Sequence, residues 1–139
     1  MPESVSHATV EALYAAYERR DFARFADMIH DDIDWIIYGP VSLFPFAGPR
    51  RGRAAVMDAI AVIAESYTLE SYKREIIIVE GARAAVMSDV NYTQRATGRT
   101  LRFRVANFLR FTGGQLIEFR EFANMFDVAE QVLGHELPV

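Results

Sequence analysis

The sequence contains no cysteine, and its three histidines, His7, His30 and His135, lie far apart. The absence of thiols excludes a disulfide framework, a thiolate metal site and a catalytic cysteine. No pair of histidines has the H-x-x-x-H spacing, or a similar spacing, of metal ligands. We therefore expect neither a metal ion nor another cofactor.

Long apolar runs are also absent. No segment approaches the roughly 20 apolar residues that a membrane span needs. The amino-terminal stretch MPESVSHATVEALYAAYERRD is amphipathic and contains acids, whereas a signal peptide has a basic start and a continuous apolar run. These features predict a cytoplasmic protein without a membrane partner.

The chain has no excess of positive charge. Its 15 lysines and arginines are outnumbered by 19 aspartates and glutamates, which gives a net charge of −4. The arginines are scattered among acids, so no basic face is available for phosphates and we expect no nucleic-acid partner. With 139 residues, of which 51% are hydrophobic, the chain is long enough for one core and too short for two. We expect a single domain over residues 1–139.

Helical patterns dominate the first half of the chain. Either Ser4 or Ser6 is suited to cap a first helix, whose apolar positions are Val10, Leu13, Tyr14 and Tyr17. Asp21 is suited to cap a short second helix, and residues 53–65 form a third helical pattern. Between them, residues 33–38 alternate like a strand, and residues 39–52 hold three prolines and three glycines, which predict irregular structure.

The apolar period then changes from 3.6 to 2. Strands are predicted at 69–80, 84–95, 100–112 and 115–124, separated by the turn signals Glu80-Gly81, Thr97-Gly98 and Gly113-Gly114. A last short helix follows, which we expect Asp127 to cap. Helices followed by a meander of long antiparallel strands predict an α+β fold.

Four segments in this layout resemble the nuclear transport factor 2-like superfamily, and in particular its SnoaL-like branch. They are HDDIDW (30–35), FAGPRRGRAAV (46–56), FRVANFLRFTGGQLIEFREF (103–122) and FDVAEQVLG (126–134). The resemblance implies a cone-shaped, curved antiparallel sheet wrapped around the N-terminal helices, with cystatin-like topology, an apolar pocket and a homodimer packed sheet to sheet. The superfamily contains isomerases, cyclases, epoxide hydrolases, dehydratases and proteins that only bind, so the fold alone does not fix the function.

The site prediction depends on strand register. A two-residue turn at Gly113-Gly114 pairs Asn107 with Arg120 and Phe103 with Asn124, so these side chains share one face. Both faces mix apolar and charged residues, so hydrophobicity does not say which is inside. The resemblance implies that the face with Asn107 and Asn124 is inside. Asn107 matches an oxyanion-hole position of ketosteroid isomerases, and Asn124 matches a catalytic aspartate of epoxide hydrolases.

The register of strand 84–95 stays open, because a turn one residue longer or shorter flips every side chain. The register that resembles the epoxide hydrolases turns Asp89 and Asn91 inward. The predicted catalytic set is then Asp89, Arg120 and Asn107, and the predicted substrate-binding set is Asn91, Asn124, Trp35, Tyr14, Tyr17, Phe103, Phe122 and Met87. Glu121 and Arg104 are expected on the outer face.

Some motifs depart from the relatives. The general base of ketosteroid isomerases falls at Ile37 and their oxyanion tyrosine at Leu13, while both epoxide hydrolase carboxylates are replaced by Asn91 and Asn124. We expect neither of those two activities.

Two functions remain in view. One is proton transfer on a small apolar carbonyl compound that contains a ring, by an isomerase, cyclase or lyase in which Asp89 is the acid–base group and Arg120 and Asn107 hold the oxyanion. The other is a non-catalytic protein that binds a small apolar molecule in the same pocket. The polar residues also have structural interpretations: Asp89 and Arg120 neutralising each other, and Asn107 and Asn124 satisfying buried backbone groups. A scaffold dimer whose pocket has no role is a third possibility.

Overall fold

Four helices accompany the sheet in the computed structural model, which describes residues 3–138. They are α1 (His7–Glu18), α2 (Phe22–Asp27), α3 (Arg53–Ser66) and α4 (Met125–Leu133). Two predicted caps are confirmed: the Ser6 hydroxyl accepts a hydrogen bond from the Thr9 N–H at 3.0 Å, and the Asp21 carboxylate accepts one from the Arg24 N–H at 3.2 Å. Each cap satisfies an N–H that has no partner within its helix.

One six-stranded sheet has the order β2-β1-β6-β5-β4-β3. Its strands are β1 (Ile29–Ile37), β2 (Gly48–Arg51), β3 (Tyr67–Glu80), β4 (Arg83–Gln94), β5 (Thr100–Thr112) and β6 (Gln115–Ala123). All neighbours pair antiparallel except β1 and β6, which are parallel. The four long strands predicted for the second half of the chain are confirmed, each within two residues at either end.

The segment predicted to be irregular contains a strand. Residues 48–51 form β2, which pairs only with β1 and is therefore an edge strand. Pro49 has no N–H to contribute to the ladder, and an edge is where a sheet tolerates such a residue. The prediction from proline content was wrong here because it did not consider a short edge position.

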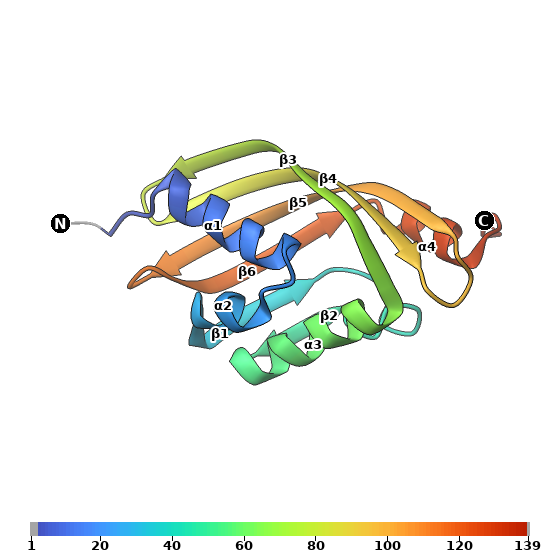
Figure 1. Ribbon diagram of the computed structural model, residues 1–139, viewed down its shortest axis with the longest axis horizontal. Helices are drawn as coiled ribbons and strands as arrows, with labels where there is room; N and C mark the ends of the chain where they lie inside the picture. Colours follow the sequence, from blue (N-terminus) through green and yellow to red (C-terminus); the bar gives the residue numbers. More distant parts are fainter. Residues whose placement is uncertain (1–2, 139) are drawn as a thin grey trace.

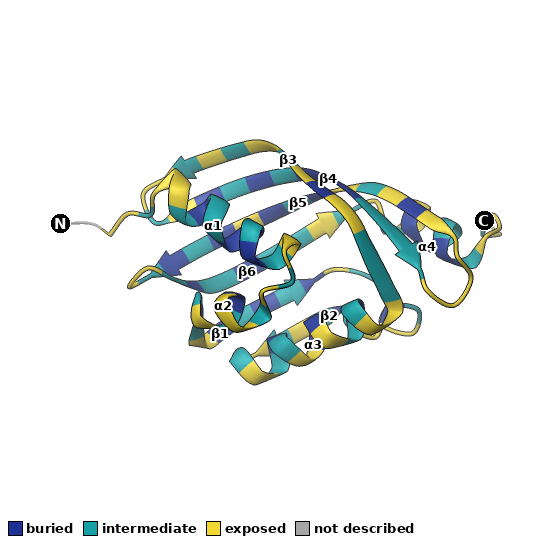
Figure 2. Cartoon of the chain, in the orientation of Figure 1, coloured by how far each residue is buried: buried dark blue, intermediate teal, exposed yellow. Residues whose placement is uncertain are grey.

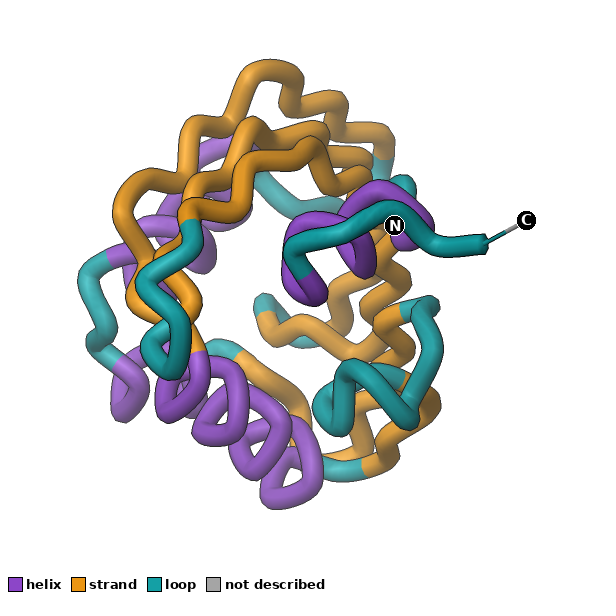
Figure 3. The backbone as a smooth tube through the Cα atoms, turned by 90° about the vertical axis from the view of Figure 1, so that its right-hand side faces the viewer, coloured by secondary structure: helices purple, strands orange, loops and turns teal. Residues whose placement is uncertain are grey.

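The sheet is curved and open, and α1, α2 and α3 lie across one face of it (Figure 1). Seen from the end, the strands bend around while α3 lies opposite them (Figure 3). Burial alternates along β4 and β5, which shows that one face of each strand is turned towards the helices (Figure 2). The core between these layers includes Val10, Ile33, Val56, Ile60 and Leu116, each at most 1% exposed. The predicted α+β class and the wrapping of the sheet around the N-terminal helices are confirmed.

A β-bulge in β6 sets the register that matters most for function. The predicted two-residue turn is present, with Thr112 opposite Gln115 and both central glycines at positive φ (55° and 76°). Phe111 lies opposite Leu116, but Arg110 lies opposite Glu118, so Ile117 is an extra residue. Beyond such a bulge every later side chain of the strand changes face relative to a regular ladder.

Within residues 3–138, no helix combines the length and the apolar character that crossing a bilayer requires.

Candidate active site

A cavity of about 100 Å³ lies between the helices and the inner face of the sheet. Its wall is mainly aromatic, with side chains from α1, α2, β1, the segment between β1 and β2, β3, β4, β5 and β6: Tyr14, Tyr17, Phe25, Trp35, Phe44, Phe46, Tyr67, Tyr72, Tyr92, Phe103 and Phe119. Trp35 and Phe119 stack with ring centroids 3.8 Å apart, which fixes one side of the cavity. In the described part of the chain no three His, Asp or Glu side chains converge as metal ligands would. The cavity is therefore suited to a small apolar molecule.

Glu121, on β6, is the one carboxylate that lines the described cavity, and no lysine, arginine or histidine lines it. Burial raises the pKa of Glu121 to about 7, because the surrounding apolar groups disfavour its charged form, while the hydrogen bond from Asn107 acts in the opposite direction. A carboxyl group with a pKa near neutrality changes protonation state readily at physiological pH. This property is what a general acid–base catalyst requires.

A chain of hydrogen bonds holds this carboxylate. The Asn107 side-chain amide donates to Glu121 Oε1 at 3.0 Å, and the Tyr14 hydroxyl donates to Asn107 Oδ1 at 2.7 Å. Asn107 is 1% exposed and lies opposite Glu121 in the β5–β6 ladder. Because the Tyr14 contact fixes the amide orientation, Asn107 presents its donor to Glu121. Among the described residues, no group forms a hydrogen bond with the second carboxylate oxygen, Oε2.

Tyrosines surround this chain. The Tyr17 and Tyr92 hydroxyl oxygens lie 3.2 Å apart, and the Tyr72 ring packs between Tyr14 and Tyr17 with centroid distances of 5.8 Å to each. Burial raises the pKa values of Tyr14, Tyr72 and Tyr92 well above 10, and the nearby charge of Glu121 adds to the effect in each case. These phenols therefore remain neutral hydrogen-bonding groups at neutral pH.

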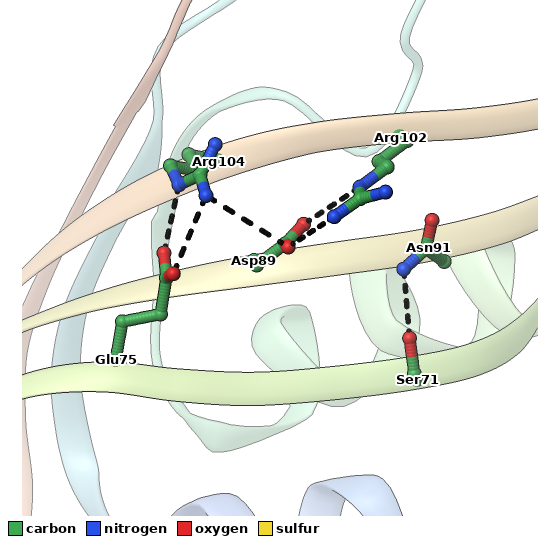
Figure 4. A network of polar contacts seen from close by, with 6 residues as sticks. All are labelled: Ser71, Glu75, Asp89, Asn91, Arg102 and Arg104. Atoms are coloured by element: carbon green, nitrogen blue, oxygen red, sulfur yellow. Dashed lines mark hydrogen bonds and ion pairs between the residues drawn. The ribbon is translucent and has the colours of Figure 1, made fainter.

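Asp89 does not reach the cavity, so the prediction that it faces inward is wrong. Its carboxylate accepts hydrogen bonds from Arg102 at 2.9 and 3.4 Å and lies 3.9 Å from an Arg104 nitrogen (Figure 4). Arg104 also binds Glu75 on the same outer face. The hydrogen bonds from Arg102 lower the pKa of Asp89, so it stays ionised at neutral pH. The expectation that Arg104 lies on the outer face is confirmed.

The register of β4 explains this error. Thr93 lies opposite Thr100, which turns Val86, Ser88 and Val90 towards the core and the alternate residues outward. Asn91 accordingly donates to the Ser71 hydroxyl at 2.8 Å on the outer face (Figure 4). Met87 shares the side of the strand occupied by Asp89 and Asn91, and it does not line the cavity. The inward register chosen by resemblance to the epoxide hydrolases was therefore wrong.

The bulge at Ile117 likewise reverses the prediction for β6. Arg120 points outward, where its guanidinium donates to the Asp34 carbonyl at 3.0 Å and lies 3.3 Å from the Asp34 carboxylate. Phe122 is 46% exposed and stacks on Tyr38 instead of forming a pocket wall. Glu121, which the sequence analysis placed outside, takes the inward position instead.

Asn124 is the cap of α4 and is exposed to solvent. Its side-chain oxygen accepts a hydrogen bond from the Asp127 N–H at 3.2 Å. The predicted pocket position of Asn124 and the predicted cap at Asp127 are both wrong. Asp127 lies in the first turn, where its negative charge stabilises the positive end of the helix dipole.

We expect Asn124→Ala to lower the free energy of unfolding by about 1 kcal/mol, the usual cost of losing such a cap. Urea denaturation would measure the change. Binding of a ligand in the cavity should not alter, since the side chain does not line it. A loss of binding with unchanged stability would contradict the capping role.

Five residues of the predicted site remain together. The cavity is lined by four of them, Tyr14, Tyr17, Trp35 and Phe103, and the fifth, Asn107, donates a hydrogen bond to Glu121. Their part in binding or catalysis stays a prediction. The sequence analysis missed Glu121, Tyr72 and Tyr92. One signal for Glu121 was available, because Leu116 and Ile117 are adjacent apolar residues that interrupt strict alternation in β6.

Solved structures resemble the chain over most of its length. The protein named "Putative Isomerase from Rhodopseudomonas palustris" is 38% identical, with a TM-score of 0.82 over 91% of this chain and 93% of that one. An NTF2-like protein from Burkholderia thailandensis E264 is 24% identical, with a TM-score of 0.79 over 90% and 95% of the two chains. A protein from Pseudomonas putida KT2440 named a "putative polyketide cyclase" is 20% identical, with a TM-score of 0.75 over 88% and 94%.

The last two structures are less than 25% identical and show the fold alone. Comparison with curated proteins finds no match. The sequence model of the SnoaL-like domain matches residues 10–119, which include most of α1, all of α2 and α3, and most of the sheet. Together with the 38% identity to the R. palustris protein, this match shows that the chain belongs to the SnoaL-like domain family.

Proposed function

We propose that this protein is an enzyme of the isomerase, cyclase or lyase type that transfers a proton on a small apolar carbonyl compound containing a ring. Glu121 is the acid–base group. The observation that carries this proposal is the position of Glu121: a lone carboxylate in an aromatic cavity, with a pKa of about 7 and one oxygen without a protein partner among the described residues.

The arrangement supports a simple reaction. The free oxygen of ionised Glu121 takes a proton from the carbon next to the carbonyl group; the C–H bond breaks, an O–H bond forms, and the electron pair moves onto the carbonyl oxygen. Protonated Glu121 then returns the proton to a carbon of the same molecule or to a leaving group. Asn107 holds the other oxygen of Glu121 throughout, and Tyr14 keeps the Asn107 amide in the donating orientation.

The relatives support the reaction class. The protein that is 38% identical carries the name of a putative isomerase, and a structural neighbour is named as a putative polyketide cyclase. Isomerisation and cyclisation next to a carbonyl group both begin with a proton transfer at carbon. A single acid–base residue that alternates between its two protonation states is sufficient for such a step.

The proposal predicts proton exchange with a defined pH dependence. In D₂O, the protein should catalyse replacement of the acidic C–H hydrogens of small cyclic ketones by deuterium, which NMR or mass spectrometry detects. Because the ionised form of Glu121 is the base, the rate should rise with pH and level off above the pKa of about 7. A rate that is independent of pH between 5 and 9, or no exchange above the protein-free background across a panel of such ketones, would contradict the proposal.

The alternative function is binding without chemistry. It is favoured by the composition of the cavity, in which Glu121 is the one acidic residue and histidine and lysine are absent from the described lining. A binding protein would show saturable uptake of small apolar compounds, with the compounds recovered unchanged and undeuterated. The exchange experiment therefore separates the two functions directly.

We also propose that the protein forms a homodimer through the outer face of the sheet. This face exposes large apolar side chains that a monomer would leave in water: Ile76, Ile78, Phe108 and Phe122, which are 46–60% exposed. Positively charged arginines and negatively charged acids lie beside them, as in the Glu75–Arg104–Asp89 network of Figure 4. A face with apolar and mixed charged groups can complement a second copy of itself across a two-fold axis.

Light scattering should give twice the chain mass of 15.8 kDa for the wild-type protein. Phe108→Asp places a charge on the apolar part of this face and should shift the species towards a monomer. Glu65→Ala, at an exposed position on the helical side, is the matched control and should leave the mass unchanged. A monomeric wild-type protein at high concentration would contradict the dimer.

A further inference from the structure

The cavity tyrosines hold more hydrogen-bond donors than the protein itself uses. The Tyr14 proton is committed to Asn107. Tyr17 and Tyr92 have two hydroxyl protons between them, but only one can lie in the single contact that joins their oxygens at 3.2 Å. Whichever hydroxyl accepts that bond keeps its own proton free. The pair therefore offers one donor without a described protein acceptor.

This pair is fixed in place by its neighbours. Tyr17 comes from α1 and packs against the Phe25 ring, with a centroid distance of 5.7 Å. Tyr92, near the end of β4, stacks on Phe103 and contacts the edge of Tyr67, both at 6.2 Å. Both tyrosines line the cavity that Glu121 lines. The wall around a molecule in the cavity thus includes both the residues that hold the free donor and Glu121.

Three other side chains of the cavity carry a donor that forms no hydrogen bond with a described residue: Trp35, Tyr67 and Tyr72. The Trp35 indole nitrogen lacks a partner among the described residues, but it is shielded from the cavity by surrounding atoms. The Tyr72 hydroxyl also forms no hydrogen bond with a described residue, although the residue is only 8% exposed. A hydroxyl that already accepts a hydrogen bond is a stronger donor than an isolated one, because hydrogen bonds in a chain polarise each other. The pair is therefore the better donor for an oxygen that gains negative charge.

Charge and size restrict the ligand further. An anionic ligand would meet the charge of Glu121 without a counter-charge, since no basic side chain lines the described cavity. The cavity volume of about 100 Å³ is smaller than the roughly 150 Å³ of an engineered apolar cavity that binds benzene. A neutral molecule with one small ring fits these limits.

We propose that the Tyr17–Tyr92 pair holds the carbonyl oxygen of a neutral, single-ring ketone while the free oxygen of Glu121 faces the carbon that loses its proton. This assignment rests on the proposed function for its reaction, but the recognition of the oxygen is testable by binding alone. The two hydroxyls act as one donor, because either of them supplies the free proton when the other is removed.

The probes are cyclopentanone and methylenecyclopentane, in which a CH₂ group replaces the oxygen, together with cyclopropanecarboxylate as an anion of similar size. Affinities are measured by NMR titration for the wild-type protein, Tyr17→Phe, Tyr92→Phe and the double variant. Each single variant keeps one hydroxyl and should weaken cyclopentanone binding by no more than about threefold. The double variant should weaken it by about tenfold or more, the usual effect of leaving a buried carbonyl oxygen unsatisfied.

Methylenecyclopentane should bind all four proteins about equally, which shows that the cavity is intact in each. Tyr38→Phe is the matched control, because it also removes one tyrosine hydroxyl, but at a position that is 41% exposed and does not line the cavity. The carbonyl stretching frequency of bound cyclopentanone gives a second measurement that needs no variant. It should lie below the frequency in an alkane solvent.

Several results would overturn the assignment: an unshifted carbonyl frequency, no binding of cyclopentanone to the wild-type protein at millimolar concentration, or tighter binding of cyclopropanecarboxylate. Loss of affinity in Tyr72→Phe but not in the double variant would assign the oxygen to Tyr72 instead. The failure of the proposed function has a different signature. In that case the affinities would follow the predicted pattern while the wild-type protein exchanged no deuterium.

Discussion

Glu121→Gln is expected to slow deuterium exchange into a cyclic ketone by a factor of about 10² to 10⁴, the usual contribution of a general acid–base group. Glutamine has nearly the same size and can still accept the hydrogen bond from Asn107, but it cannot take up a proton. Ketone affinity should change much less than the rate. The rate is followed by NMR under saturating ketone.

Asp89→Asn is the matched control for this prediction. It also replaces a carboxylate by an amide on the same sheet, but on the outer face, where the carboxylate binds Arg102. Its exchange rate should stay within about threefold of the wild-type rate, since the side chain does not line the cavity. If Asp89→Asn removed activity and Glu121→Gln preserved it, the assignment of the acid–base group would be wrong.

The second large effect concerns stability. Glu121 has a pKa of about 7 in the folded protein, against an ordinary value of 4.5. The folded state therefore holds a proton at pH values where the unfolded state has lost it, and stability falls as pH rises through this interval. Glu121→Gln removes this dependence. Between pH 4 and pH 9, the variant should gain about 3 kcal/mol in free energy of unfolding relative to the wild-type protein.

Urea denaturation of both proteins across this pH range measures the change. Using the difference between the two proteins cancels the titration of the other carboxylates, which both share. Asp89→Asn should show no such change between pH 4 and pH 9, because its ion pair lowers the pKa of Asp89 and the carboxylate stays ionised throughout this range. A constant difference between Glu121→Gln and the wild-type protein from pH 4 to 9 would show that Glu121 titrates as an exposed residue does.

The helices, five of the six strands and the fold class could be predicted because their signals are local. Ser6 and Asp21 cap the helices as expected, since a cap depends only on residues three or four positions away. β2 could not be predicted, because the prolines and glycines of residues 39–52 indicate a loop until a partner strand is known. The structure has Asn124 as the cap of α4, whereas the sequence analysis predicted Asp127, because both residue types suit a cap position.

The site could be predicted only in part, because it depends on strand register. Asn107 was placed correctly on the inner face, together with Phe103, by the resemblance to ketosteroid isomerases, because both faces of β5 mix apolar and charged residues. Glu121 was placed on the wrong face because one extra residue, Ile117, moves the rest of β6 by one position. A carboxylate on an inward face is also unexpected on hydrophobicity alone, since burial of a charge costs free energy. Functional residues break the pattern that sequence reasoning depends on.

Glu121 is a half-buried acid whose pKa lies near neutral pH, and its ionisation can be measured directly. Carbon-13 NMR of protein labelled at the glutamate side-chain carboxyl carbons follows this group through a pH titration, with Glu121→Gln identifying its signal. We expect a midpoint at about pH 7, well above the ordinary glutamate value of 4.5. A midpoint near 4.5 would show that Glu121 is solvated as an ordinary surface residue is, and would contradict both the proposed chemistry and the site on which it rests.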